Sequence, residues 1–84
     1  MRPTMPAGTI RYWAAARAAA GLAEEPWSGS TLAEVLAAAG ERHGADLARV
    51  LSVASFLVDG DRVRAETALR DGSTIEVLPP FAGG

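Results

Sequence analysis

The sequence TLAEVLAAAGERHG, residues 31–44, contains the element that decides the fold. Thr31 followed three residues later by Glu34 is the capping-box pattern, in which Thr31 caps the first turn of a helix and Glu34 reaches back to the N–H of Thr31. The apolar residues of this segment recur at helical spacing and form one stripe, made of Leu32, Val35, Leu36 and Ala39. The pattern predicts a helix that runs to about His43, with Gly44 just past its end.

In residues 9–14, well before this helix, Ile10, Tyr12 and Ala14 alternate with Thr9, Arg11 and Trp13. Alternation predicts a strand, with Ile10 and Tyr12 on the core side and Trp13 pointing outward. An exposed side chain as large as Trp13 calls for a functional reason only where other apolar groups surround it.

Residues 74–78 alternate in the same way at the other end of the chain. We expect a last strand with Ile75 and Val77 facing inward and Leu78 facing outward, ended by two prolines, which lack the ladder N–H. If the first and last strands are neighbours, Trp13 and Leu78 lie on the same outer face. That placement favours a docking surface over a local loop covering these groups.

Weaker signals complete the pattern. Short helical turns are expected at residues 14–20 and 46–51, and strands at 22–27, 53–58 and 61–64. Asp59-Gly60 is a hairpin signal, and Leu69 is expected to anchor a second turn in the core. The order is strand, turn, strand, helix, strand, short strand, strand. This order predicts an α+β fold of the β-grasp type, a mixed sheet with one main helix across one face.

The chain organises into three parts on this interpretation. Residues 1–8 are expected to form a flexible leader, residues 9–78 the domain, and residues 79–84 a flexible tail that ends in Gly83-Gly84. Fully extended, six tail residues span roughly 20 Å, and glycine lets such an arm enter a channel where a Cβ would clash. The domain then serves to present the terminal carboxylate of Gly84. The alternative is an ordinary frayed terminus in which Gly-Gly has no role.

Composition excludes several classes of function. The net charge of −2 leaves no electrostatic footprint for nucleic acid or an anionic membrane. The sequence contains no cysteine, so a thiol nucleophile and a thiolate metal site are excluded, and a carrier of sulfur would have to hold it on the terminus. All eight basic residues are arginine, so the domain offers no lysine amine for linkage to another copy. We expect a soluble cytoplasmic protein that binds no metal and no resident cofactor.

Catalytic constellations are absent from the sequence as well. The single histidine, His43, stands near a helix end and is interpreted as a solvated residue that interacts favourably with the helix dipole. The pair Glu24-Glu25 is interpreted as solvated charge. Arg11, Arg17, Arg62 and Arg64 are candidates for a local basic strip, either for an acidic partner or for solubility.

Three segments resemble the small subunit of molybdopterin synthase, within the ubiquitin-like sulfur carriers (the MoaD/ThiS-like group). They are IRYWAAAR at residues 10–17, TLAEVL at 31–36 and LRDGSTIEVLPPFAGG at 69–84. The third is the most specific, and the first favours the molybdopterin branch over the thiazole-forming carriers. Two departures concern Asp59-Gly60, where the family often has Asn before its turn, and Arg62, near a position where an apolar interface residue is expected.

The resemblance implies a role for particular residues. Gly84 would be adenylated by a ubiquitin-activating-like adenylyltransferase that uses ATP, and a persulfide donor would convert it to a thiocarboxylate for molybdenum cofactor biosynthesis. Pro80, Phe81, Ala82 and Gly83 would occupy a channel of the molybdopterin synthase large subunit, while Trp13, Arg17, Leu78 and Phe81 would contact that partner. The chain itself would be a non-catalytic subunit of the sulfurtransferase complex. Alternatives are a carrier for cysteine or thiazole synthesis, a ubiquitin-like protein modifier, and a plain interaction module.

Overall fold

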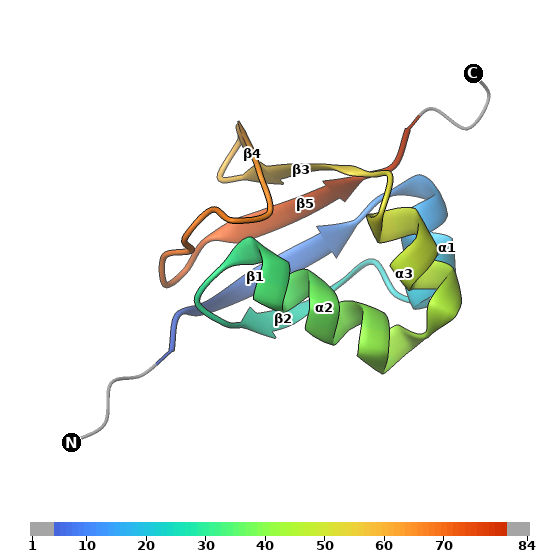
Figure 1. The fold of residues 1–84 in the computed structure, drawn as a ribbon, viewed down its shortest axis with the longest axis horizontal. Helices are drawn as coiled ribbons and strands as arrows, with labels where there is room; N and C mark the ends of the chain where they lie inside the picture. The colour runs from blue at the N-terminus through green and yellow to red at the C-terminus, as the bar shows by residue number, and fades with distance from the viewer. Residues whose placement is uncertain (1–4, 81–84) are drawn as a thin grey trace.

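The computed structural model describes residues 5–80, which form a five-stranded sheet with three helices (Figure 1). The elements in chain order are β1 (Ala7–Tyr12), α1 (Ala14–Ala20), β2 (Glu24–Ser28), α2 (Leu32–His43), α3 (Ala45–Leu51), β3 (Ser55–Val58), β4 (Asp61–Val63) and β5 (Thr74–Leu78). Every predicted helix and strand is present, with boundaries that shift by at most a few residues.

The sheet has the strand order β2-β1-β5-β3-β4. β1 pairs with β5 in parallel, and the other neighbouring pairs are antiparallel. The first and last strands are therefore central neighbours, and the main helix follows the β1–β2 hairpin and crosses one face (Figure 1). This is the β-grasp arrangement, and the expected fold class is confirmed.

The core lies between the sheet and its helices. Its buried apolar residues are Ile10, Tyr12, Ala16, Trp27, Leu32, Val35, Ala39, Leu47, Leu51, Leu69, Ile75 and Val77. Ile10, Ile75 and Val77 are fully buried, so the predicted faces of the two central strands are confirmed. Leu69 is buried as well, as expected for the residue that anchors its turn.

The start of α2 differs in one detail from the predicted capping box. The Thr31 hydroxyl oxygen accepts a hydrogen bond from the backbone N–H of Glu34 at 3.3 Å, as predicted. The Glu34 carboxylate, however, accepts from the backbone N–H of Ser30 at 2.8 Å rather than from that of Thr31. Ser30 is one residue before Thr31, so the Glu34 carboxylate still satisfies a backbone N–H at the start of the helix. Its negative charge also remains favourable at the positive end of the helix dipole.

The first strand begins at Ala7, two residues before the expected Thr9, so the predicted leader boundary at Gly8 is corrected. Gly8 is packed against its neighbours: a Cβ at this position would lie 2.1 Å from the carbonyl oxygen of Ser73. That same carbonyl accepts a hydrogen bond of 3.0 Å from the indole Nε1–H of buried Trp27. Only glycine allows the two strands and the indole to meet here, a tertiary contact that leaves no trace in local sequence pattern. Residues 1–4 lie outside the described part of the chain.

Glu25, which we expected to be solvated, is instead the centre of a carboxylate cluster formed with Tyr12, Arg42 and His43. Its carboxylate accepts hydrogen bonds from the Tyr12 hydroxyl at 2.6 Å and from Arg42 at 3.0 Å, and it contacts Nε2 of His43 at 2.6 Å. The Glu25 and His43 side chains are only 12% and 15% exposed. The cluster joins β1, β2 and the end of α2, so the expected solvated roles of Glu25 and His43 are both wrong.

The electrostatics of this cluster follow from its geometry. Burial alone would raise the pKa of Glu25, but hydrogen bonds from Arg42, Tyr12 and His43 outweigh burial and lower that pKa to about 2. Burial and the neighbouring Glu25 carboxylate both raise the pKa of Tyr12. Glu25 is therefore a structural anion rather than an acid–base group.

The hairpin predicted at Asp59-Gly60 is confirmed. Both residues have positive φ, 50° and 88°, as a tight two-residue hairpin turn requires. The Asp59 carboxylate accepts from the Ser73 hydroxyl at 2.8 Å and from the Thr74 N–H at 2.9 Å. Hydrogen bonds from the Thr74 backbone and the Ser73 side chain lower the pKa of Asp59. The acidic residue thus ties this turn to the start of β5.

Candidate docking site at the end of the central strands

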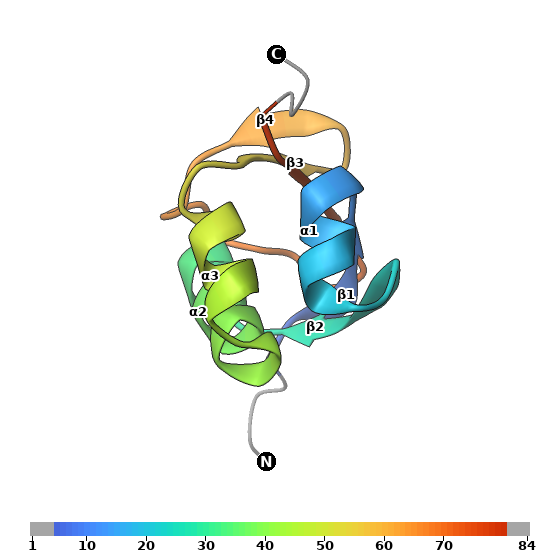
Figure 2. The same ribbon diagram turned by 90° about the vertical axis from the view of Figure 1, so that its right-hand side faces the viewer.

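Because β1 and β5 run in parallel, they finish at the same end of the sheet. We call this end, formed by Tyr12, Trp13, Val77 and Leu78, the exit edge. The backbone N–H of Trp13 donates to the carbonyl of Val77 at 3.2 Å, which holds Trp13 beside the end of β5. Figure 2 looks onto this end of the molecule, where α1 and α3 pack against each other. The last described residues, Pro79 and Pro80, leave the sheet here.

The outer face of the sheet is the face opposite the helices. Strand register places five of its residues in one row across the sheet: Glu24, Arg11, Glu76, Leu57 and Arg62. Arg11 and Arg62 are thus separated by an acidic and an apolar residue. The contiguous basic strip considered from the sequence is therefore wrong for this face, because the sheet interleaves the charges.

Trp13 is 42% exposed, one of the few large apolar side chains at the surface of residues 5–80. Its indole Nε1–H donates to the Glu76 carboxylate at 3.0 Å. The Arg11 guanidinium carbon lies 5.3 Å from the centroid of the indole ring, within range of a cation–π interaction. Arg11 in turn contacts Glu24 at 3.5 Å. We refer to Trp13, Arg11, Glu76 and Glu24 as the indole cluster.

The other predicted interface residues lie around this cluster. Arg17 is exposed on α1 and lines, together with Arg11 and Trp13, a small hollow of about 90 Å³. Leu78 is half-buried on the outer face, one residue beyond the Tyr12–Val77 pair, so Trp13 and Leu78 share that face. Pro80 is exposed. The remaining predicted tail residues, Phe81, Ala82, Gly83 and Gly84, lie outside the described residues.

Sequence reasoning missed two features of the exit edge. Val53 is 62% exposed and lies two residues before Ser55, which pairs with Leu78. The sequence pattern places Val53 inside a strand, but the strand starts only at Ser55. α3 ends at Leu51 as predicted, and the backbone N–H of Val53 still donates to the carbonyl of Val50 at 3.1 Å, so the chain turns here before it becomes extended. The indole cluster was missed too, although the outward positions of Arg11 and Glu76 on adjacent strands are a signal that could have revealed their pairing.

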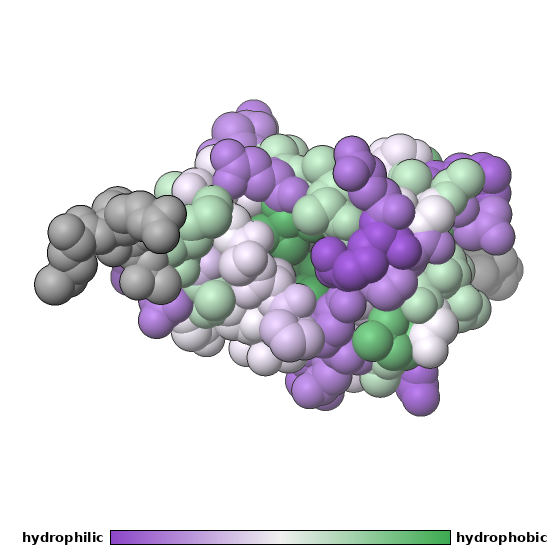
Figure 3. Space-filling view, turned by 90° about the horizontal axis from the view of Figure 1, so that it is seen from below, coloured by the Kyte–Doolittle hydropathy of each residue, from purple (hydrophilic) through white to green (hydrophobic). Residues whose placement is uncertain are grey.

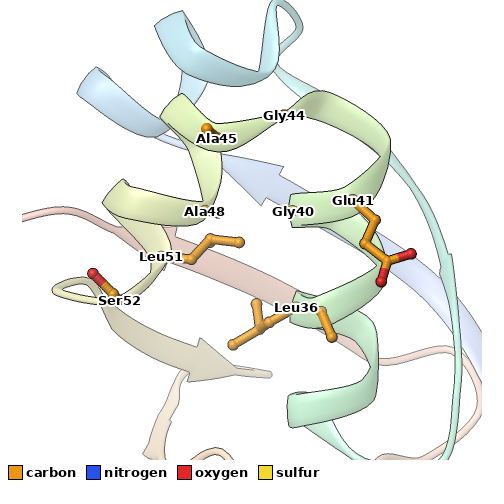
Figure 4. A pocket seen from close by; sticks show the side chains of 9 residues that line it. Leu36, Gly40, Glu41, Gly44, Ala45, Ala48, Leu51 and Ser52 are labelled. Carbon is orange, nitrogen blue, oxygen red and sulfur yellow. The ribbon is translucent and has the colours of Figure 1, made fainter.

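A second hollow, of about 460 Å³, lies between α2 and α3. Its lining residues are Leu36, Ala37, Gly40, Glu41, Gly44, Ala45, Ala48, Leu51 and Ser52. Figure 4 shows Leu36 and Leu51 pointing into the space between the two helices. Glu41 is the only titratable residue in this lining, so the hollow holds no set of groups for acid–base chemistry.

Another face of the molecule, the grouping of possible metal ligands and the length of the helices also bear on function. Figure 3 shows the side of the molecule that carries α2, where apolar surface is confined to small areas separated by polar side chains. Within residues 5–80, no three His, Asp or Glu side chains come together as a metal site. Among the same residues, no helix has the length and apolar character needed to cross a membrane.

The fold and the exit edge define a protein of the ubiquitin-like β-grasp class. The model of the ThiS family matches residues 10–84, and the chain therefore belongs to the ThiS family. This is a family of ubiquitin-fold sulfur carriers and modifiers of the MoaD/ThiS type, whose small proteins are generally non-catalytic carriers. The recognised resemblance is confirmed at this level.

Solved structures agree with this assignment. Small archaeal modifier protein 1 from Methanosarcina acetivorans is 27% identical, with a TM-score of 0.84 over 98% of this chain and 100% of that chain. Small archaeal modifier protein 1 from Haloferax volcanii is 20% identical, with a TM-score of 0.81 over 93% and 99%. The complex of subunits 1 and 2 of molybdopterin-converting factor from Helicobacter pylori contains a chain that is 22% identical, with a TM-score of 0.67 over 93% of this chain and 99% of that chain. The last two show the fold alone. No curated protein matches the sequence.

Proposed function

We propose that this protein is the sulfur carrier of molybdenum cofactor biosynthesis, the small subunit of molybdopterin synthase. The observation that carries the proposal is the exit edge, where parallel β1 and β5 bring the departure of the Pro79-Pro80 segment next to exposed Trp13. A partner that docks on Trp13 would receive the tail in the same encounter. The family match, which extends to Gly84, supports this use of the tail.

The proposed chemistry takes place on the carboxylate of Gly84. An ionised carboxylate is a poor electrophile, so an adenylyltransferase would use ATP to form an acyl-adenylate with release of pyrophosphate. A persulfide would displace AMP to give an acyl disulfide, and a thiol would cleave that S–S bond, leaving the thiocarboxylate and a disulfide. The nucleophilic thiocarboxylate sulfur would then attack a precursor held by the partner and displace the group that it replaces. Water would cleave the acyl–sulfur bond of the resulting thioester, which leaves the sulfur on the precursor and restores the Gly84 carboxylate.

The partner in this proposal is the molybdopterin synthase large subunit. The Helicobacter pylori structure, whose first subunit shares this fold, is a complex of subunits 1 and 2 of molybdopterin-converting factor. Trp13, Leu78, Arg17 and Phe81 would contact the large subunit. Pro80, Ala82 and Gly83 would follow the channel to its active site, which would supply the catalytic groups.

Sulfur loading tests the proposal directly. The full chain is incubated with a ubiquitin-activating-like adenylyltransferase, ATP and a persulfide donor, and its intact mass is measured. We expect exchange of one oxygen for one sulfur, dependent on ATP and lost in a control chain that lacks Gly83-Gly84. An unchanged mass with several such activating enzymes would contradict the proposal. Co-purification with a sulfhydrylase or a thiazole synthase in place of the large subunit would assign the carrier to cysteine or thiazole synthesis.

A second candidate function is that of a ubiquitin-like protein modifier. The similarity to small archaeal modifier protein 1 favours it, because that match is 27% identical over almost the whole of both chains. In this case the activated Gly84 would form an isopeptide bond with a lysine of another protein. Conjugates of higher mass in cell extract, absent for the chain without Gly83-Gly84, would establish it. The lysine-free sequence predicts that such conjugates contain no chains linked through this protein's own lysines.

A further inference from the structure

We propose that Glu76 and Arg11 are positioning residues that hold the Trp13 indole ready for the partner before the two proteins meet. The inference rests on the proposed function, because the partner is the molybdopterin synthase large subunit. It assigns to two charged residues of the outer face a role that is distinct from direct contact with that partner.

The geometry restrains Trp13 at several points. Its backbone N–H is bonded to Val77, and its carbonyl accepts from the N–H of Ala16 at 2.9 Å, which fixes the main chain between β1 and α1. The hydrogen bond to Glu76 fixes the edge of the indole, and the Arg11 guanidinium lies over the ring. A side chain that is 42% exposed would otherwise sample several rotamers.

Restraint of this kind matters for binding because association costs the freedom of each side chain that becomes ordered. Energetic hot spots of protein interfaces are enriched in tryptophan. An indole already held in one orientation enters its pocket without that ordering cost. The bond from the indole N–H to a carboxylate is charge-assisted and therefore stronger than one between neutral groups.

The arrangement of charges fits burial by a partner. Glu76 accepts from the Trp13 indole and lies opposite Arg11 in the register of β1 and β5, and Arg11 is further paired with Glu24. When a partner covers the indole, the Glu76 carboxylate keeps its hydrogen bond and its basic neighbour. The partner therefore does not have to compensate a newly buried lone charge, which would be costly. An apolar pocket without a charged group suffices to accept Trp13.

The first test needs no partner. In the free 15N-labelled protein, the order parameter of the Trp13 indole N–H is measured in the wild type, in Glu76→Leu and in Glu66→Leu, a control that removes an exposed carboxylate elsewhere. The Trp13→Phe variant assigns the signal against that of buried Trp27. We expect a clear drop in order for Glu76→Leu and none for Glu66→Leu. An unchanged order parameter in Glu76→Leu would overturn the inference.

A double-mutant cycle with the large subunit then separates positioning from contact. We expect Glu76→Leu to weaken the Kd about tenfold, equivalent to about 1.4 kcal/mol. Glu76→Gln, whose amide oxygen still accepts the hydrogen bond, should rescue most of the loss. In a Trp13→Ala background, Glu76→Leu should have no further effect; an undiminished effect there would show direct contact and overturn the inference.

The two experiments also distinguish this inference from the proposed function. Sulfur loading of Gly84 reports on the carrier role and does not require an ordered indole. Wild-type loading together with an unrestrained indole would overturn the positioning role alone. Failure to load with sulfur, with an ordered indole that depends on Glu76, would overturn the carrier proposal and with it the assignment of the partner.

Discussion

The two sides of β1 carry the same kind of interaction with opposite consequences. On the inner side, the Tyr12 hydroxyl donates to Glu25 in the carboxylate cluster; just past the end of the strand, the Trp13 indole donates to Glu76 on the outer face. Glu25 is largely buried and ties three elements together, whereas Trp13 remains exposed and joins only the ends of two strands. We call Tyr12 and Glu25 the inner pair, and Trp13 and Glu76 the outer pair. The comparison indicates that the inner pair stabilises the fold and that the outer pair holds an exposed side chain in place for binding.

The largest effect is expected from breaking the inner pair. Glu25→Leu leaves the Tyr12 hydroxyl, Arg42 and His43 without their shared acceptor in a poorly solvated site. Removing one member of a buried charged network costs about 3 kcal/mol. We expect urea unfolding to show a loss of that size, with Glu24→Leu as the matched control from the adjacent exposed position. Equal effects of the two variants would contradict a special role for Glu25.

Acid should weaken the same pair by a smaller amount. The pKa of Glu25 is lowered in the folded protein from 4.5 to about 2, so the folded state binds its proton less readily than the unfolded state. The stabilisation from this group is fully present above pH 4.5 and is lost as pH falls towards 2. We expect the difference in unfolding free energy between wild type and Glu25→Gln to shrink across this range. A constant difference would show that Glu25 does not titrate as the structure implies.

Breaking the outer pair should affect binding instead of folding. Trp13→Ala is expected to weaken binding to the large subunit by about 2 kcal/mol, the range of an interface hot spot. Isothermal titration calorimetry measures the change. Val53→Ala, a truncation of another exposed apolar residue near the exit edge, provides the comparison. A smaller loss for Trp13→Ala than for Val53→Ala would move the centre of the docking surface to the β3 side.

The smallest effect is that of the outer pair on stability. Glu76→Leu removes an exposed hydrogen bond, and substitutions of this kind usually change the free energy of unfolding by within about 0.5 kcal/mol. Chemical denaturation of Glu76→Leu beside Glu25→Leu would reveal the contrast. A loss for Glu76→Leu comparable to that for Glu25→Leu would remove the distinction between the two sides of β1.

Local pattern was enough to predict the elements and the faces of the central strands. Ile10, Tyr12, Ile75 and Val77 point inward as their alternation indicated, because residues two apart in a strand share one face. α2 begins and ends where its cap and its glycine place it. The outward position of Trp13 followed from the same alternation. These features depend only on neighbours along the chain.

Features that join distant segments could not be predicted in this way. The close approach of Gly8 to Ser73 and the burial of His43 against Glu25 depend on strand register and on the packing of α2. Gly8 was therefore assigned to the leader and His43 to the solvent. The arginine strip was wrong for the same reason, because the sequence does not show that Glu76 and Leu57 lie between Arg11 and Arg62 in the sheet.

The order of elements and the polarity of each face could thus be inferred from residue types and their spacing, because both reflect local geometry. The C-terminal segment was identified instead by its resemblance to a known family. Tertiary structure alone determined which charged groups meet: Glu25 with Tyr12 and His43, and Glu76 with Trp13. Such pairings arise between residues more than ten positions apart, and only the register of packed strands and helices brings their side chains within hydrogen-bonding distance.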